Sequence, residues 1–186
     1  ERILAVTFTN KAAREMRERL GHMLDDAKLP VVVTFHGLGR ILLERFGTRI
    51  GVPRYFAIFD RDDSERAVKE ALKALDVDPK EVPPRAILAR MGKAKGDGLS
   101  ASEFRTKHAH ESFRSRITAE VWSRYDETLK REKSLDFDDL IALPARLLRD
   151  HADIREEAEK LFSYIHVDEY QDTNVLQCEL AGMLAR

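Results

Sequence analysis

The chain has 186 residues, of which 43% are hydrophobic and 35% are charged, and its formal net charge is -1. This length suits one domain or two small lobes, and the apolar fraction is sufficient for a buried core. A net charge so close to zero excludes a strong overall basic field. Any nucleic acid would therefore have to bind through a local patch or through stacking side chains.

Cys178 is the only cysteine, which excludes a disulfide within the chain and is typical of a reducing, cytoplasmic compartment. No apolar run approaches the roughly 20 residues that a membrane-spanning helix needs, and no signal-peptide pattern is present. The chain begins at Glu1 without a methionine and stops at Arg186 inside a helical pattern. We therefore expect it to be a fragment of a longer protein.

The first fifty residues alternate between short apolar runs and helical patterns. Residues 3–8 form a nearly continuous apolar run, which is typical of a strand covered on both faces, and Thr9 or Asn10 can cap the helix that follows. A second apolar strand is predicted over 31–35, before His36 and the glycine after it turn the chain into another helix. This strand–helix–strand–helix order predicts a parallel, helix-covered sheet.

Helical patterns dominate from about residue 51 to about residue 161, and no predicted strand there is longer than residues 55–59. Residues 91–98 ("MGKAKGDG") indicate a flexible turn between helices. The helix signals in this interval are caps at Asp60, at Ser100 with Glu103 and at Asp136, prolines at Pro84 and Pro144, and an apolar stripe of Ile117, Val121, Tyr125 and Leu129 with Trp122 beside it.

A buried strand is predicted again over residues 162–167, followed by a final helix capped by Thr173. The whole pattern predicts one α/β lobe with a parallel sheet, interrupted by an all-helical insertion of more than half the chain. Pro144 is expected to kink or end the helix that it lies in.

Three carboxylates gather where the last strand ends, in the string "YIHVDEYQDTN". Like charges at this spacing repel one another unless a cation or hydrogen-bond donors offset them. Because ligands collect beyond the carboxyl ends of parallel strands, Asp168 and Glu169 would face such a site. One carboxylate can hold Mg²⁺ and the other can orient a water for attack on a phosphate. The alternative is a strand end whose acids are merely solvated.

The string "TFTNKA" lies where the first strand gives way to a helix. A helix N-terminus offers free N–H groups to a phosphate, and the aromatic ring of Phe8 can stack on a base without reading sequence. The alternative is a core phenylalanine beside an ordinary helix cap.

Four motifs carry a family resemblance. "VDEYQDTN" (residues 167–174) resembles the Walker B motif, motif II, of the UvrD/PcrA/Rep family of superfamily 1 DNA helicases. "LAVTFTNKAAREMRERL" (4–20) and "TFHG" (34–37) are similar to motifs Ia and Ib, and "LDFDDLI" (135–141) is similar to a segment near the end of the inserted helical subdomain. The order and spacing agree, so the resemblance covers essentially the whole chain.

The resemblance implies a partial RecA-like P-loop NTPase domain, 1A, over residues 1–38 and 162–186, with helical subdomain 1B over 39–161. It implies that Asp168 binds Mg²⁺ and that Glu169 is the base that positions the attacking water. Gln171, with Asp172, would belong to the network that couples the nucleotide state to DNA.

The resemblance also implies contacts to DNA. Phe8, with its neighbours Thr9, Asn10 and Lys11, would contact single-stranded DNA, and Thr34 and His36 would contact its backbone. Lys95 would touch duplex DNA, because a matching lysine occurs in the family's insertion; without the resemblance, it reads as a solvated lysine in a turn. The expected ligands are therefore ATP and Mg²⁺, with single-stranded DNA and single-strand/duplex junctions as the substrates.

No G-x-x-x-x-G-K-[ST] phosphate loop occurs in the chain. The expected parent is an ATP-dependent DNA helicase that moves 3′ to 5′, in repair or replication, and this fragment alone is expected not to hydrolyse ATP. Two alternatives stay open: the helicase part of a RecB/AddA-type helicase–nuclease, and a non-catalytic relative that binds DNA or docks a partner.

Overall fold

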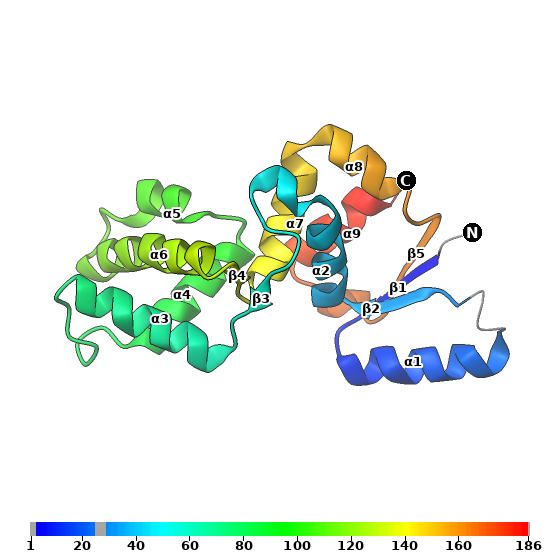
Figure 1. Ribbon diagram of the computed structural model, residues 1–186, viewed down its shortest axis with the longest axis horizontal. Helices are drawn as coiled ribbons and strands as arrows, with labels where there is room; N and C mark the ends of the chain where they lie inside the picture. Colours follow the sequence, from blue (N-terminus) through cyan, green and yellow to red (C-terminus); the bar gives the residue numbers. More distant parts are fainter. Residues whose placement is uncertain (1–2, 25–28, 186) are drawn as a thin grey trace. The chain divides into compact units, whose positions relative to one another are not determined.

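The computed structural model describes residues 3–24 and 29–185 (Figure 1). They form two compact units, which are described separately: unit 1 comprises Glu1–Arg54 and Leu143–Arg186, and unit 2 comprises Tyr55–Ala142. The predicted fold class, a partial parallel α/β sheet interrupted by a helical insertion, is confirmed and is consistent with a partial RecA-like domain. Unit 2 is shorter at both ends than the insertion expected over residues 39–161. The 1A and 1B ranges stay a prediction.

Unit 1 contains a three-stranded parallel sheet in the order β2–β1–β5. Its strands are β1 (Ile3–Thr7), β2 (Val31–Thr34) and β5 (Tyr164–Val167). Thr7 is in register with Thr34, and the residue before Thr7 is in register with the last residue of β5. The carboxyl ends of all three strands therefore lie at one edge of the sheet.

Helices cover both faces of this sheet (Figure 1). On one face, Ala5 packs with Ala13 of α1 (Asn10–Met23) and with Val32. On the other face lie α2 (Phe35–Phe46) and α9 (Val175–Leu184). Because side chains alternate along a strand, β1 contributes buried residues to both layers, as its continuous apolar sequence predicts.

The last strand differs from its prediction. Residues of β5 alternate between exposed and half-buried, and Tyr164 is 53% exposed. Within the described residues β5 has one neighbouring strand, β1, so it is an edge strand. The prediction of a buried strand is wrong here, and the apolar Leu161 and Phe162 are buried just before the strand begins.

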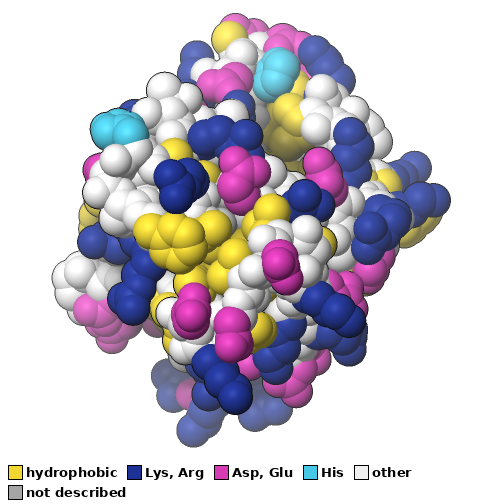
Figure 2. All heavy atoms as spheres, turned by 90° about the vertical axis from the view of Figure 1, so that its left-hand side faces the viewer, with side chains coloured by type: hydrophobic (Ala, Val, Ile, Leu, Met, Phe, Trp, Pro, Cys, Tyr) yellow, Lys and Arg dark blue, Asp and Glu magenta, His cyan; other side chains and the backbone are white. Residues whose placement is uncertain are grey.

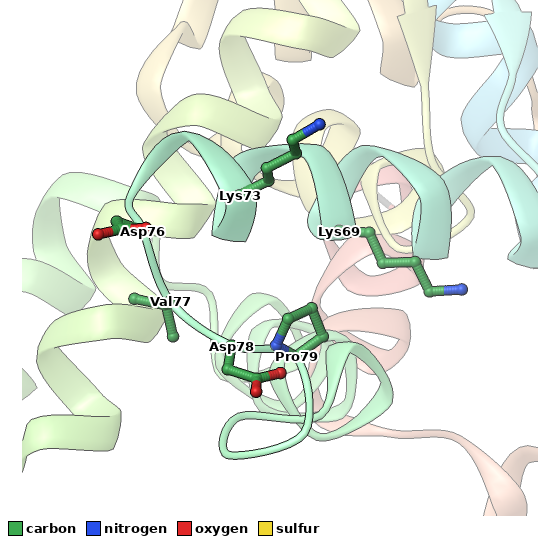
Figure 3. Close-up of a pocket in the computed structure, with 6 residues that line it drawn as sticks. All are labelled: Lys69, Lys73, Asp76, Val77, Asp78 and Pro79. Carbon is green, nitrogen blue, oxygen red and sulfur yellow. The ribbon is translucent and has the colours of Figure 1, made fainter.

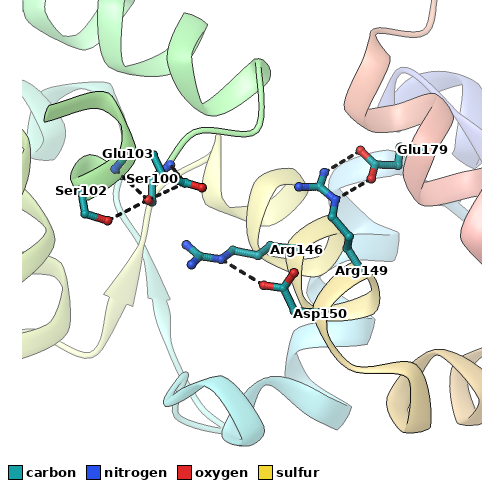
Figure 4. A network of polar contacts seen from close by, with 7 residues as sticks. All are labelled: Ser100, Ser102, Glu103, Arg146, Arg149, Asp150 and Glu179. Carbon is teal, nitrogen blue, oxygen red and sulfur yellow. Dashed lines mark hydrogen bonds and ion pairs between the residues drawn. The ribbon is translucent and has the colours of Figure 1, made fainter. Parts of the chain in front are cut away.

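Further helices complete unit 1. These are η2 (Gly47–Ile50), most of α7 (Asp139–Asp150), α8 (Ala152–Glu159) and η3 (Tyr170–Asp172). Pro144 lies inside α7 and does not end it. Figure 4 shows how α7 is tied to α9: the guanidinium of Arg149 donates to both carboxylate oxygens of Glu179 at 2.7 Å.

Unit 2 is a helical bundle with one short strand pair. Trp122 and Tyr125 are fully buried at its centre, which confirms them as core residues. Its elements are β3 (Ala57–Ile58), α3 (Arg61–Ala74), α4 (Pro84–Gly96), α5 (Ala101–His108), α6 (Phe113–Arg131) and β4 (Ser134–Leu135), with β3 parallel to β4.

Most predicted helix starts are confirmed. Asp60 forms a reciprocal capping box at the start of α3, and Ser100 does so with Glu103 at the start of α5 (Figure 4). The predicted cap of α9 is wrong by one residue. Asn174 accepts a hydrogen bond from the backbone of Gln177, and the Thr173 hydroxyl instead donates to the carbonyl of Tyr170.

The predicted turn over residues 91–98 is also wrong. The chain stays helical to Gly96, the last residue of α4. It leaves the helix through Asp97 and Gly98, and Gly98 has a φ of 78°. This left-handed backbone favours glycine and ends the helix there.

The face of the molecule drawn in Figure 2 carries both signs of charge. Lysine and arginine side chains are interspersed with aspartate and glutamate around a hydrophobic patch near the centre of this face. The face therefore shows no single-sign field, in keeping with the near-zero net charge. In the part of the chain that the structure describes, no helix is long and apolar enough to cross a membrane.

Candidate functional site

The carboxylates of motif II sit at the carboxyl edge of the sheet. The backbone N–H of Asp168 donates to the carbonyl of Val6 at 2.9 Å, which extends the β1–β5 ladder by one residue. Asp168 is thereby fixed beside the end of β1, with its side chain exposed. The position is the one at which parallel sheets bind ligands.

Glu169 adopts a left-handed backbone, with φ 52° and ψ 44°. This conformation is uncommon for residues other than glycine, and such residues cluster at functional sites. It turns the chain directly into η3, and there the side-chain amide of Gln171 donates to the carboxylate of Glu169. The three residues predicted to be catalytic, Asp168, Glu169 and Gln171, therefore occupy one turn.

At the carboxyl end of β1, Phe8 lies between Thr7 and Thr9, which are hydrogen-bonded to each other. The hydroxyl of the fully buried Thr7 accepts the N–H of Thr9 at 3.3 Å and lies 3.2 Å from its carbonyl. The hydroxyl of Thr9 caps α1 by accepting the N–H of Ala12 at 3.0 Å. Phe8 is half-buried, and its ring contacts Phe35 with the ring centroids 5.6 Å apart.

Two further residues that are predicted to contact DNA lie in the first turn of α1. Asn10 and Lys11 are both exposed. Thr9, not Asn10, caps the helix. Lys11 lies 3.8 Å from Glu15, and at this exposure the ion pair contributes little to stability and leaves the ammonium accessible.

The β2 edge ends in a second helix cap. The hydroxyl of Thr34 accepts the N–H of Gly37 at 3.1 Å at the start of α2. His36 is half-buried in the first turn of that helix. Thr34 and His36 therefore lie at the same sheet edge as Phe8, next to the strand that carries it.

Lys95 is placed differently from its expectation. It is 4% exposed in unit 2, and its ammonium binds the carboxylates of Asp136 and Asp139, each at 2.7 Å. A buried and doubly paired ammonium offers no exposed charge to a phosphate, so a DNA contact by Lys95 is not compatible with this arrangement. The sequence interpretation took Asp136 for a helix cap, and it missed that Asp136 and Asp139 both bind Lys95.

An open hollow in unit 2 offers no comparable site. It lies beside the end of α3 and is lined by Lys69, Lys73, Asp76, Val77, Asp78 and Pro79. Figure 3 shows the two lysines and the two aspartates pointing in different directions, without converging on one point. The sheet edge of unit 1 is therefore the candidate functional site.

Comparisons with known proteins show the family to which the chain belongs. The model of the UvrD/REP helicase N-terminal domain matches residues 1–186. The chain belongs to the UvrD/REP helicase family. It is 42% identical over its whole length to the ATP-dependent DNA helicase PcrA of Leuconostoc citreum. It is 39% identical over 98% of its length to PcrA helicases of Staphylococcus epidermidis and Staphylococcus aureus.

The chain spans about a quarter of the length of these curated relatives, 25% in each case. In this UvrD/REP helicase domain, no cluster of three or more His, Cys, Asp or Glu among the described residues is placed to hold a metal ion. Asp168 nevertheless suits Mg²⁺, which keeps most of its water shell and commonly takes one or two carboxylates together with substrate phosphates.

Proposed function

We propose that the chain is part of an ATP-dependent DNA helicase that moves 3′ to 5′ along single-stranded DNA and unwinds duplexes at single-strand/duplex junctions. The cytoplasm, with a role in repair or replication, is the proposed setting. The observation that carries the proposal is the shared sheet edge, where Asp168 and Glu169 follow β5 and Phe8 follows the adjacent β1. Nucleotide chemistry and a DNA track would thus meet on neighbouring strands.

At the nucleotide side, Asp168 would hold Mg²⁺, which when bound neutralises charge that develops on the phosphates. The carboxylate of Glu169 would accept the proton of the attacking water. Gln171 would hold that carboxylate in place through its amide hydrogen bond. The sequence contains no G-x-x-x-x-G-K-[ST] loop to cradle the phosphates, so we infer that these residues alone do not turn over ATP.

At the DNA side, Phe8 would stack on a base without reading its identity. Thr9, Asn10 and Lys11 would lie along the phosphates, close to the free N–H groups of the α1 N-terminus. Thr34 and His36 would contact the backbone from the next strand. Binding through stacking and a short polar edge agrees with a chain that has no overall basic charge.

The test is Glu169→Gln in the full-length protein. The amide keeps the size of the side chain but cannot accept the proton, so we expect ATP affinity to stay and turnover to fall by about 10²- to 10⁴-fold. Glu18→Gln, at an exposed glutamate of α1 in the same unit, is the matched control and should keep wild-type turnover. Turnover near the wild-type rate in Glu169→Gln would show that Glu169 is not the base.

A further inference from the structure

Two aromatic rings meet at the sheet edge that is proposed to carry DNA. Phe8 is the residue after β1 and Phe35 is the residue after β2. Because Thr7 and Thr34 are paired, the two phenylalanines leave the sheet side by side. Their ring centroids are 5.6 Å apart and their planes are tilted by 58°. This is a favourable arrangement for an aromatic pair.

The two rings have different environments. Phe35 is the first residue of α2 and is only 1% exposed, so no ligand reaches its ring. Phe8 is half-buried and keeps part of its ring accessible. One ring is therefore a fixed support and the other is available for contact.

The backbone of Phe8 is also fixed, from the other side. The buried hydroxyl of Thr7 is hydrogen-bonded to the backbone of Thr9, which closes a short loop around Phe8. Thr9 in turn is held as the N-cap of α1. With the backbone set, the remaining freedom of Phe8 is the rotation of its side chain, and the contact with Phe35 restricts that rotation.

We propose that Phe35 is a positioning residue for DNA binding: it holds the Phe8 ring in the orientation in which a nucleobase stacks on it, without touching DNA. The proposal rests on the proposed function, since it assumes that Phe8 contacts DNA. A ring that is ordered in advance does not lose its rotational freedom when the base arrives, so binding is tighter than for a mobile ring.

The experiment is a double-mutant cycle in the full-length protein, with affinity for a fluorescein-labelled oligothymidylate measured by anisotropy. Phe8→Ala should weaken binding by roughly 5- to 150-fold, the loss of one stacked base. Phe35→Leu should weaken it by roughly 2- to 10-fold, the range of an aromatic pair. In the Phe8→Ala background, Phe35→Leu should change affinity by less than about 2-fold, because its partner is gone.

The controls separate positioning from folding. Phe46→Leu makes the same substitution at a buried residue at the far end of α2 and should leave affinity unchanged. Phe35→Tyr keeps the ring and should keep affinity. Phe35→Met keeps most of the volume without the ring and replaces Phe35→Leu if that variant does not fold, as judged by thermal melting.

The outcomes distinguish the two proposals. If Phe8→Ala binds the oligonucleotide like the wild type, the DNA edge of the proposed function is wrong. If Phe8→Ala weakens binding but Phe35→Leu is equally harmful with and without Phe8, then Phe35 acts only through the core and the positioning role is overturned.

Discussion

The ammonium of Lys95 lies 2.7 Å from Oδ2 of Asp136 and 2.7 Å from Oδ1 of Asp139, in the interior of unit 2. The hydroxyl of Tyr125 lies 3.1 Å from the same oxygen of Asp136. Burial alone lowers the pKa of the Lys95 ammonium, but the two carboxylates outweigh burial and the pKa is raised. The network joins the end of α4 to the residues that lead into α7.

The first prediction is that Lys95→Met destabilises unit 2. Removing one partner of a buried ion pair leaves uncompensated charge, which typically costs about 3–5 kcal/mol. Urea denaturation followed by circular dichroism should show this loss as a lower midpoint. Lys93→Met removes an exposed lysine of the same helix and should change the free energy of unfolding by less than about 0.5 kcal/mol. Weaker DNA binding by a Lys95→Met protein of undiminished stability would instead restore Lys95 as a DNA contact.

The second prediction concerns the pH dependence of the same network. Burial, and then the neighbouring Asp136, raise the pKa of Asp139 to about 6, while Lys95 opposes the shift. The raised pKa of Lys95 favours its charged form, whereas the raised pKa of Asp139 favours its neutral form. The charged form of Asp139 is disfavoured because the single ammonium of Lys95 neutralises the charge of only one of the two buried carboxylates.

The sign follows from proton binding. An aspartate titrates near pH 3.9 in the unfolded chain, so between about pH 4 and pH 6 the folded state binds more protons than the unfolded state. This group therefore lowers the stability as the pH rises through that window. Lys95→Met removes the opposing charge and raises the pKa of Asp139 further. Its destabilisation should be larger at pH 8 than at pH 5, and equal losses at both would mean that Asp139 is already neutral in the wild type.

The third prediction compares two glycines of α4. Alanine favours a helix over glycine by about 1 kcal/mol, and a Cβ at Gly96 would meet no atom within 4 Å. A Cβ at Gly92 would lie 2.8 Å from Oδ2 of Asp138, so that carboxylate would have to move. Thermal melts should therefore place Gly96→Ala above the wild type and Gly92→Ala below Gly96→Ala. Equal melting temperatures for the two variants would show that Asp138 yields without cost.

These features also show how far the sequence could be interpreted. Helix starts were predictable where the chemistry is local, as at Ser100 and Glu103, whose side chains need only the backbone three residues away. At the last helix, Thr173 and Asn174 are both good caps, and Gln177, three residues after Asn174, favours the second. A capping-box search would have found it.

Two of the errors, at Lys95 and at β5, arose where a partner lies far away along the chain. Lys95 read as a solvated lysine because Asp136 and Asp139 come more than a helix later, and no local pattern joins them. The exposure of β5 depends on which strands lie beside it, which an apolar run does not encode. The motif residues were easier to place together, because the carboxyl ends of parallel strands meet at one edge in any such sheet.

The last prediction separates the roles of Glu169 and Gln171. The amide of Gln171 donates to the Glu169 carboxylate, whose residue already holds a left-handed backbone. In the full-length protein, Gln171→Ala should lower kcat for ATP by roughly 10- to 100-fold with little change in KM, because a base that is less well placed affects the chemical step. The measurement is steady-state ATP turnover with saturating DNA.

Gln171→Glu sharpens the test. A glutamate carboxylate at position 171 has no N–H to donate, and its negative charge repels the carboxylate of Glu169 from the place in which the amide holds it. Gln171→Glu should therefore lower kcat at least as far as Gln171→Ala. If both variants kept the wild-type kcat, the hydrogen bond would have no part in placing the base, and the left-handed turn at Glu169 would have to orient the carboxylate by itself.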